Sequence, residues 1–162
     1  MERITDSHVF FWGSEFSNWF DCTYKNIKYK SITFFNSEQA FMWEKAIFFG
    51  DMETAKKIIE TPSPREAKLL GLEVKDFDAD KWSAVSYQIM VDVNYAKFSQ
   101  NPRLEKVLLE TGDRTIVEAS PYDRIWGIGI HWDNDDCLDE TKWKGQNLLG
   151  KALMEVREKL KK

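Results

Sequence analysis

The stretch Ser37-Glu38-Gln39-Ala40-Phe41-Met42-Trp43-Glu44-Lys45 decides the fold class of this 162-residue chain. Apolar side chains recur along it at helical spacing, so it predicts an amphipathic helix. The hydroxyl of Ser37 can accept a hydrogen bond from a free amide of the first turn, which predicts that the helix begins there and ends near Gly50.

Strands are expected before this helix and further helices after it. Residues 8–20 and 27–35 are rich in Phe, Ile, Thr and Tyr and predict short strands joined by a polar turn at 24–26. Later in the chain, Ser63-Pro64-Arg65-Glu66 has the spacing of a capping box at a helix start. Other elements are expected as helices beginning at Asp51, at Asp78 or Asp80 and at Asn101-Pro102, a strand at 115–119, and a closing helix at 146–160.

This order of elements, with strands at both flanks and helices between them, predicts an α+β fold. Because there is no internal repeat or Gly/Ser linker, we expect a single largely helical domain with a small sheet, spanning residues 1–162.

Composition excludes several classes of protein. Seven Trp, 11 Phe and 5 Tyr supply too much apolar area for a disordered chain. A net charge of −4 argues against electrostatic capture of bare nucleic acid or an anionic membrane. However, residues 133–140 hold five acids and no Lys or Arg, so the rest of the chain is nearly neutral and a locally basic cleft stays open as an alternative.

Cysteine and histidine spacing gives no sign of a metal or disulfide framework. Cys22 and Cys137 form no CxxC pair, and His8 and His131 lie far apart. We therefore expect no metal and no cofactor. The charged amino terminus and the lack of a long apolar run predict neither a signal peptide nor a membrane span, so a cytoplasmic protein without a membrane or an obligate protein partner is expected.

Two groups of residues are candidates for chemistry. On a helix, Glu38 and Lys45 share the apolar stripe with Phe41, and a charge in such a place usually has a partner or a function. The alternative is that Glu38 only complements the helix dipole. The segment Asp123-Arg124-Ile125-Trp126-Gly127-Ile128-Gly129 has an acid, a base, a Trp and two glycines after a proline turn. Equally, Asp123 could close an Asx turn while Trp126 fills the core.

Trp82, near the start of the expected long helix, is likewise open to two interpretations. It is either a core residue or a platform for a planar ligand.

Taken together, the segments resemble the NADAR family of YbiA-like N-glycosidases over nearly the full chain. Each segment is weak evidence alone, whereas the shared order is specific. The matching segments are Phe16-Ser17-Asn18-Trp19, Ser37 to Phe41, Ala67 to Gly71, Trp82, Met90 with Ala96-Lys97-Phe98, Leu109 to Gly112, Val117-Glu118, Asp123 to Gly129, and Trp143 with Gly145 to Gly150.

The resemblance implies a largely helical α+β domain that cleaves N-glycosidic bonds to ribose, without a cofactor. The implied substrates are small N-ribosyl phosphates, such as the ribosylamino-pyrimidine phosphates of riboflavin synthesis, or ADP-ribosyl compounds. Removal of ADP-ribose from guanine in DNA is an alternative, and so is a non-catalytic module that binds ADP-ribose or a nucleotide.

The resemblance also implies roles for particular residues. Glu38 would stabilise the positively charged sugar, and Asp123 would be the second carboxylate, as in O-glycoside hydrolysis. One departure is visible, because many members have His where this chain has Gln39. The residues expected to bind substrate are Trp82 and Trp126 as aromatic walls, Lys45, Lys97 and Arg124 for phosphate, and Asn18 and Gly127 within the matching segments.

Overall fold

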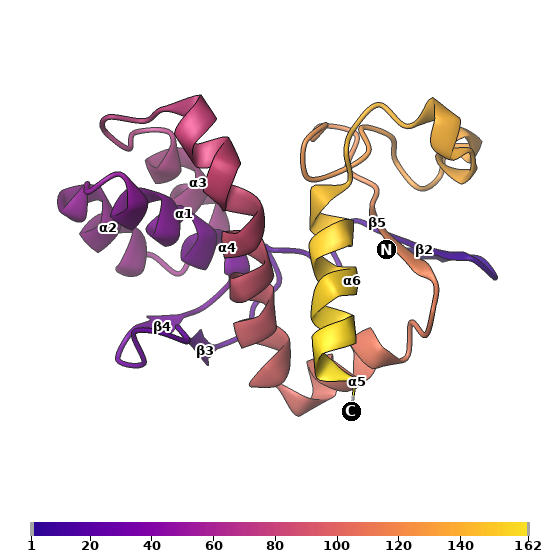
Figure 1. Cartoon of the computed structure of the whole chain (residues 1–162), viewed down its shortest axis with the longest axis horizontal. Helices are drawn as coiled ribbons and strands as arrows, with labels where there is room; N and C mark the ends of the chain where they lie inside the picture. The colour runs from indigo at the N-terminus through magenta and orange to yellow at the C-terminus, as the bar shows by residue number, and fades with distance from the viewer. Residues whose placement is uncertain (1, 162) are drawn as a thin grey trace. The chain divides into compact units, whose positions relative to one another are not determined.

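The computed structural model describes residues 2–161, which gather into two compact units (Figure 1). The continuous unit is Asn18–Asn101, and the discontinuous unit combines residues 2–17 with 102–161. The described residues contain six α-helices and five short strands, so the predicted α+β class is confirmed. The division into one domain stays a prediction.

The continuous unit is built around its first helix, which packs on the other three (Figure 1). Its core is apolar, with Phe34, Ala46 and Ile58 at most 1% exposed. The elements are β3 (Tyr24–Lys25), β4 (Thr33–Phe34), α1 (Ser37–Phe48), α2 (Met52–Ile59), α3 (Pro64–Gly71) and α4 (Ala79–Ser99).

A glycine lies at the contact between α1 and α3. A Cβ on Gly71 would overlap Sδ of Met42, so a larger residue there would require the Met42 side chain to move. The helix α3 ends at Gly71, whose backbone is not in the left-handed region.

The cap of α1 differs from the prediction. The helix begins at Ser37 as expected, but the capping side chain is Asn36, whose Oδ1 accepts from the N–H of Gln39 at 2.8 Å. The hydroxyl of Ser37 is instead 2.9 Å from the hydroxyl of Tyr24 in the core. An Asn amide oxygen reaches the first turn as well as a Ser hydroxyl does, so sequence alone did not separate them.

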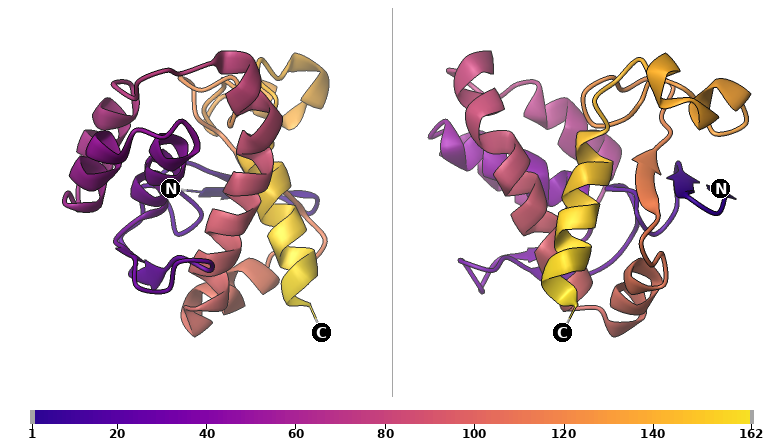
Figure 2. Two further views of the ribbon diagram at one scale, coloured as in Figure 1. Left: turned by 60° about the vertical axis from the view of Figure 1, so that its left-hand side comes forward. Right: turned by 45° about the vertical axis from the view of Figure 1, so that its right-hand side comes forward.

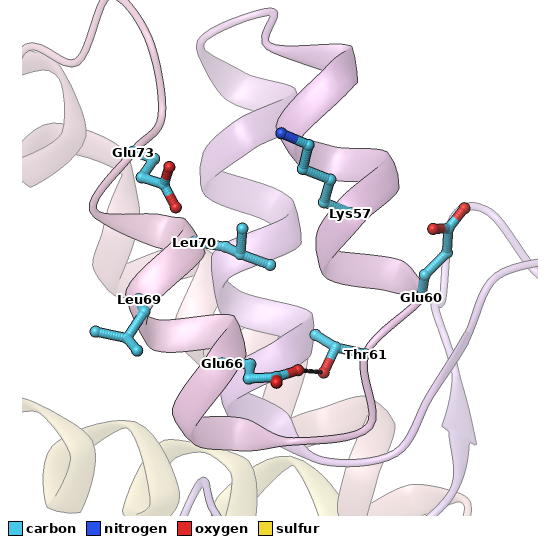
Figure 3. A pocket seen from close by; sticks show the side chains of 7 residues that line it. All are labelled: Lys57, Glu60, Thr61, Glu66, Leu69, Leu70 and Glu73. Carbon is cyan, nitrogen blue, oxygen red and sulfur yellow. Dashed lines mark hydrogen bonds between the residues drawn. The ribbon is translucent and has the colours of Figure 1, made fainter.

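The capping box at α3 is half formed. Ser63 Oγ accepts from the N–H of Glu66 at 3.2 Å, as predicted. The carboxylate of Glu66 does not return the bond to the backbone of Ser63. Figure 3 shows that it accepts from the hydroxyl of Thr61, at 2.5 Å, and so links the start of α3 to the loop after α2.

Asp51 caps α2, and its ionised carboxylate contributes to the stability of the continuous unit. Its carboxylate accepts from the N–H of Lys75, from the hydroxyl of Thr54 and from the N–H of Thr54. These hydrogen bonds, that from Lys75 first, lower the pKa of Asp51 from 3.8 to about 2. A carboxyl whose pKa is lowered by folding adds stability above its unfolded pKa and loses it as the pH falls through the folded value.

We therefore expect the free energy of unfolding to decrease between pH 4 and pH 2 partly through Asp51. The variant Asp51→Asn has no carboxylate there, so its free energy of unfolding should fall less over that interval. Urea unfolding at several pH values measures both slopes. Equal slopes for the two proteins would show that the capping carboxylate does not contribute.

The discontinuous unit is a small sheet with a helix packed on it. The strand β2 pairs antiparallel with β1 and parallel with β5, and Phe10 lies opposite Val117. The closing helix α6 packs against β5 (Figure 2). The elements are β1 (Glu2–Ile4), β2 (His8–Phe11), α5 (Pro102–Leu109), β5 (Thr115–Glu118), the 3₁₀ turns Asp135–Leu138 and Glu140–Lys142, and α6 (Leu148–Leu160).

The two amino-terminal strand predictions were too long. Of residues 8–20 only His8–Phe11 form a strand, and the turn expected at 24–26 begins with the strand β3. The actual turn follows Asn26, whose Oδ1 accepts from the N–H groups of Lys28 and Tyr29. Aromatic-rich segments favour strands only where a neighbouring strand is available to pair with them.

Within the described residues, no helix is long and apolar enough to cross a membrane.

Candidate active site

Glu38 lies in the first turn of α1, and the preceding loop holds its backbone. The N–H of Glu38 donates to the backbone oxygen of Asn18 at 2.9 Å. Glu38 is half-buried, and its negative charge partly offsets the burial that lowers the pKa of Lys45, which lies two turns along the same helix face. The first turn is also where the helix dipole favours a carboxylate. Both interpretations of Glu38 are compatible with this position.

Lys45 is held at the far end of the same stripe. Its Nζ donates to the backbone oxygen of Gly71 at 2.8 Å and lies 4.5 Å from the centroid of the Phe77 ring. Burial lowers the pKa of Lys45, and the negative charge of Glu38 opposes that shift. The ammonium therefore closes the carboxyl end of α3 and is electrostatically coupled to the candidate catalytic group.

Trp82 packs in an aromatic cluster on α1. Its ring centroid lies 5.2 Å from that of Phe41, 6.0 Å from Phe48 and 6.2 Å from Phe49. Phe41 is one turn from Glu38, so Trp82 covers the apolar stripe that starts at the candidate carboxylate. Its half-buried ring completes the packing and leaves part of its surface accessible.

Two amide side chains have buried acceptor atoms, namely Asn18, which was expected to bind substrate, and Asn94, which was not predicted. Oδ1 of Asn18 and Oδ1 of Asn94 are buried and accept no hydrogen bond within residues 2–161. The amide of Asn18 donates to Sδ of Met90 at 3.4 Å, and that of Asn94 donates to the backbone oxygen of Met90 at 3.0 Å. A buried polar atom without a partner usually marks a functional place or an absent bonding group.

Asn94 belongs to a buried face of α4 that ends at Lys97. The side chain of Lys97 is 0% exposed, and its Nζ lies 4.9 Å from the ring centroid of Phe98 and 5.6 Å from that of Phe20. The signal in the sequence was the occurrence of Asn94 at helical spacing among apolar residues, where Asn is unusual. Lys97 was expected to bind phosphate, whereas Asn94 was not predicted.

Gln39, the departure from the usual His, points into the protein. Its Oε1 accepts from the N–H of Phe35 at 2.7 Å. Its Nε2 donates to the backbone oxygen of Thr61 at 2.7 Å and also approaches the last carbonyls of α2, those of Ile58 and Ile59, at 3.1 and 3.3 Å. Gln39 therefore joins α1 to the carboxyl end of α2 and is fully buried.

The predicted residues of the discontinuous unit lie together in one loop. Oδ1 of Asp123 accepts from the N–H groups of Ile125 and Trp126, each at 2.9 Å. This is the Asx turn that the sequence left as an alternative, and it positions the half-buried Trp126. Arg124, the phosphate candidate, is exposed in the same turn.

Gly127 is required by chain packing. A Cβ there would lie 2.9 Å from the backbone oxygens of Asp123 and Glu118. The loop is further tied to the start of α6, because the N–H of Asn147 donates to the oxygen of Gly127 and the N–H of Gln146 to that of Arg124. The glycine thus admits neighbouring backbone, a reason that needs no ligand.

Two further features of the described residues bear on a functional site, namely the placement of potential metal-ligating side chains and an open groove. No group of three or more His, Cys, Asp or Glu within residues 2–161 is placed to hold a metal ion. An open groove of about 410 Å³ runs between α2 and α3 (Figure 3), but none of the predicted site residues lines it. Its lining residues are Lys57, Glu60, Thr61, Glu66, Leu69, Leu70 and Glu73.

Comparison with known proteins agrees with the resemblance seen in the sequence. "N-glycosidase R617" of Acanthamoeba polyphaga mimivirus is 43% identical over 164 residues, covering 95% of this chain and 96% of the relative. "N-glycosidase YbiA" of Escherichia coli is 33% identical over 134 residues, covering 83% of this chain and 75% of the relative. The NMR structure of E. coli YbiA superposes with a TM-score of 0.77 at 29% identity, covering 98% of this chain and 87% of that one.

A third relative carries a pathway in its name. "Riboflavin biosynthesis protein PYRR, chloroplastic" of Arabidopsis thaliana is 32% identical over 109 residues, which is 65% of this chain and 16% of the relative. The NADAR domain matches residues 10–161, a range that includes segments of both compact units and all the predicted site residues. The predicted resemblance is confirmed, and the chain belongs to the NADAR family.

Proposed function

We propose that this chain hydrolyses the N-glycosidic bond between a ribose, carrying a phosphate or an ADP group, and a base. It is a hydrolase acting on N-glycosyl bonds, since relatives covering most of its length are named N-glycosidases. The observation that carries the proposal is the half-buried Glu38 in the first turn of α1, with its backbone held by Asn18.

The reaction needs a negative charge beside the sugar. As the bond from C1′ to the base nitrogen breaks, its electron pair goes to the nitrogen and the sugar becomes oxocarbenium-like. Water then forms the new bond to C1′, and its proton completes the leaving base. The carboxylate of Glu38 stabilises the cationic sugar and orients the attacking water. A half-buried position strengthens that interaction, because less water screens the charge.

Asn18, whose backbone is hydrogen-bonded to that of Glu38, supplies a hydrogen-bond acceptor. Its Oδ1 is buried and accepts no hydrogen bond within the described chain, while its backbone oxygen holds the N–H of Glu38. We assign this Oδ1 to a ribose hydroxyl, which would satisfy the buried acceptor and orient the sugar.

The remaining site residues have supporting roles in the proposal. Trp82 presents part of an aromatic face to the planar base. Lys45 and Lys97 supply positive charge for a phosphate, as the exposed Arg124 does in the discontinuous unit. Trp126 and Gly127 are assigned to base binding by family resemblance alone. Asp123 is proposed as a second carboxylate, which orients ribose hydroxyls or protonates the leaving nitrogen.

The role of Asp123 can be separated from its structural role. In Asp123→Asn the amide oxygen accepts the same two N–H bonds, so the free energy of unfolding should stay within about 0.5 kcal/mol of the parent. Loss of the carboxylate should lower turnover about 10²-fold. If the variant turned over substrate as fast as the parent protein, the role of Asp123 would be structural, in the Asx turn, and not catalytic.

The favoured substrate class is the ribosylamino-pyrimidine phosphates of riboflavin synthesis, because one relative is named for that pathway. The test incubates the protein with such a phosphate and, separately, with DNA that carries ADP-ribosylated guanine, followed by mass spectrometry. Free pyrimidine with free ribose phosphate supports the proposal. If only the DNA were cleaved, with release of ADP-ribose, ADP-ribosylated guanine would be the substrate and not the pyrimidine phosphate. A ligand that is bound but not cleaved would favour a binding module.

A further inference from the structure

A second cavity lies on the other side of α1 from the candidate active site. It has a volume of about 260 Å³ and lies within the continuous unit, where the β3–β4 hairpin, α1 and α4 meet. At 100° per residue, the α1 residues that line it, Ala40 and Glu44, are turned roughly 160° and 120° from Glu38. It is therefore separate from the site assigned to the glycoside.

The walls of this cavity are mostly apolar. They combine side chains from the hairpin with a face of α4, and they suit a small alkyl or aryl group. The phenol of Tyr24 adds no free polar group, because its hydroxyl lies 2.9 Å from that of Ser37. The apolar lining residues are Ile27, Phe34, Ala40, Ile89, Val93 and Ala96.

The polar lining is acidic. Glu44 is half-buried, and its Oε1 accepts from Nδ2 of Asn26 at 2.8 Å. Asp92 and Lys28 complete the charged groups of the lining, so carboxylates outnumber ammonium groups two to one. Among residues 2–161, no Lys or Arg nitrogen lies within 4.0 Å of the Glu44 carboxylate, and Nζ of Lys28 lies over the Tyr29 ring instead.

Burial raises the pKa of Glu44, the hydrogen bond from Asn26 opposes that shift, the charge of Asp92 adds to it and that of Lys28 opposes it. A cation brought next to this carboxylate would compensate the cost of its burial. A second carboxylate at the same cavity disfavours an anionic ligand.

We propose that this cavity binds a small organic ammonium ion, a primary amine with a short alkyl or aryl body, whose nitrogen pairs with Glu44 while its carbon atoms lie on the apolar walls. The pairing is a charge-assisted hydrogen bond in a partly desolvated place, which is stronger than one at the surface. The small volume limits the ligand to about one ring or a short chain.

Benzylamine is a suitable probe, and benzyl alcohol is its neutral counterpart with the same ring. We expect benzylamine to shift the backbone amide signals of residues 26–28, 44 and 89–96 in ¹⁵N NMR titrations of the full chain, with tighter binding than benzyl alcohol. Equal binding of the two compounds, or shifts confined to other residues, would overturn the proposal.

Two variants test the charge. Glu44→Gln keeps an oxygen for the Asn26 amide and should weaken benzylamine binding at least tenfold, while benzyl alcohol binds as before. Lys28→Gln removes the competing cation and should strengthen benzylamine binding. The matched control is Glu53→Gln, which changes an exposed glutamate of α2 and should leave both affinities unchanged. Unchanged benzylamine affinity in the folded Glu44→Gln variant would contradict the assignment, and neither variant involves a residue of the glycosidase proposal.

Discussion

Replacing Glu38 by Gln is expected to lower the rate of N-glycoside hydrolysis by about 10²–10³-fold, comparable to the loss of one preorganised electrostatic group elsewhere. The substitution keeps the shape of the side chain and the backbone hydrogen bond from residue 38 to Asn18, but it removes the charge that stabilises the cationic sugar. Steady-state release of base from a ribosylamino-pyrimidine phosphate measures the effect.

The alternative role of Glu38 makes the opposite prediction. If Glu38 only complements the dipole of α1, Glu38→Gln costs about 0.3–1 kcal/mol of stability and leaves the rate unchanged. The exposed Glu53, also in the first turn of a helix, provides the matched control, since Glu53→Gln should alter neither rate nor substrate affinity. Parent-level turnover in Glu38→Gln would refute the catalytic assignment.

A second signal accompanies the loss of charge. Burial lowers the pKa of Lys45, and at present Glu38 opposes that shift. Without the carboxylate the pKa of Lys45 should fall further, which NMR titration of the side chain can follow. This readout reports the electrostatic coupling between the two residues even when no substrate is present.

Gln39→Ala is expected to destabilise the protein by about 3 kcal/mol, the largest stability effect predicted. The change leaves the N–H of Phe35 without its acceptor and the buried oxygen of Thr61 without its amide donor. Each buried group left unsatisfied costs about 1–3 kcal/mol, and the lost side-chain volume adds to this. Urea or thermal unfolding measures the difference.

Gln88→Ala is the control for this prediction. Gln88 is an exposed glutamine on α4, and its amide donates to Asp92 at the surface, so its loss should cost within about 0.5 kcal/mol. A Gln39→Ala variant no less stable than Gln88→Ala would contradict the structural role of Gln39. Because the side chain of Gln39 is buried and bonded to the backbone, its contacts are with the protein itself.

Most helix starts and the family could be predicted from the sequence, because their signals are local. Asp51 and Ser63 cap the helices that they were expected to cap, and Asp78 caps the long α4. A cap depends on three or four neighbouring residues, so the chain carries that information within one short window.

The candidate site was predictable only in part. Glu38 and Lys45 were found because two charges on an apolar stripe are visible in the sequence, and their electrostatic coupling agrees with that pattern. The buried acceptor of Asn18 was not visible, and neither was the internal bonding of Gln39. Met90, which accepts from the amide of Asn18, is 72 positions away, and the carbonyls that accept from Nε2 of Gln39 are 19 to 22 positions away, so no local pattern identifies them.

The sequence by itself therefore determined the α+β class, the helix boundaries set by capping residues, and membership in the NADAR family. Only the tertiary structure decided which hydroxyl or amide forms each cap, that Gly71 lies against Met42, and which carboxylates line the cavity where the β3–β4 hairpin, α1 and α4 meet. The reason is physical: capping and periodicity act between near neighbours, whereas close packing and the burial of a charge arise only when distant segments meet.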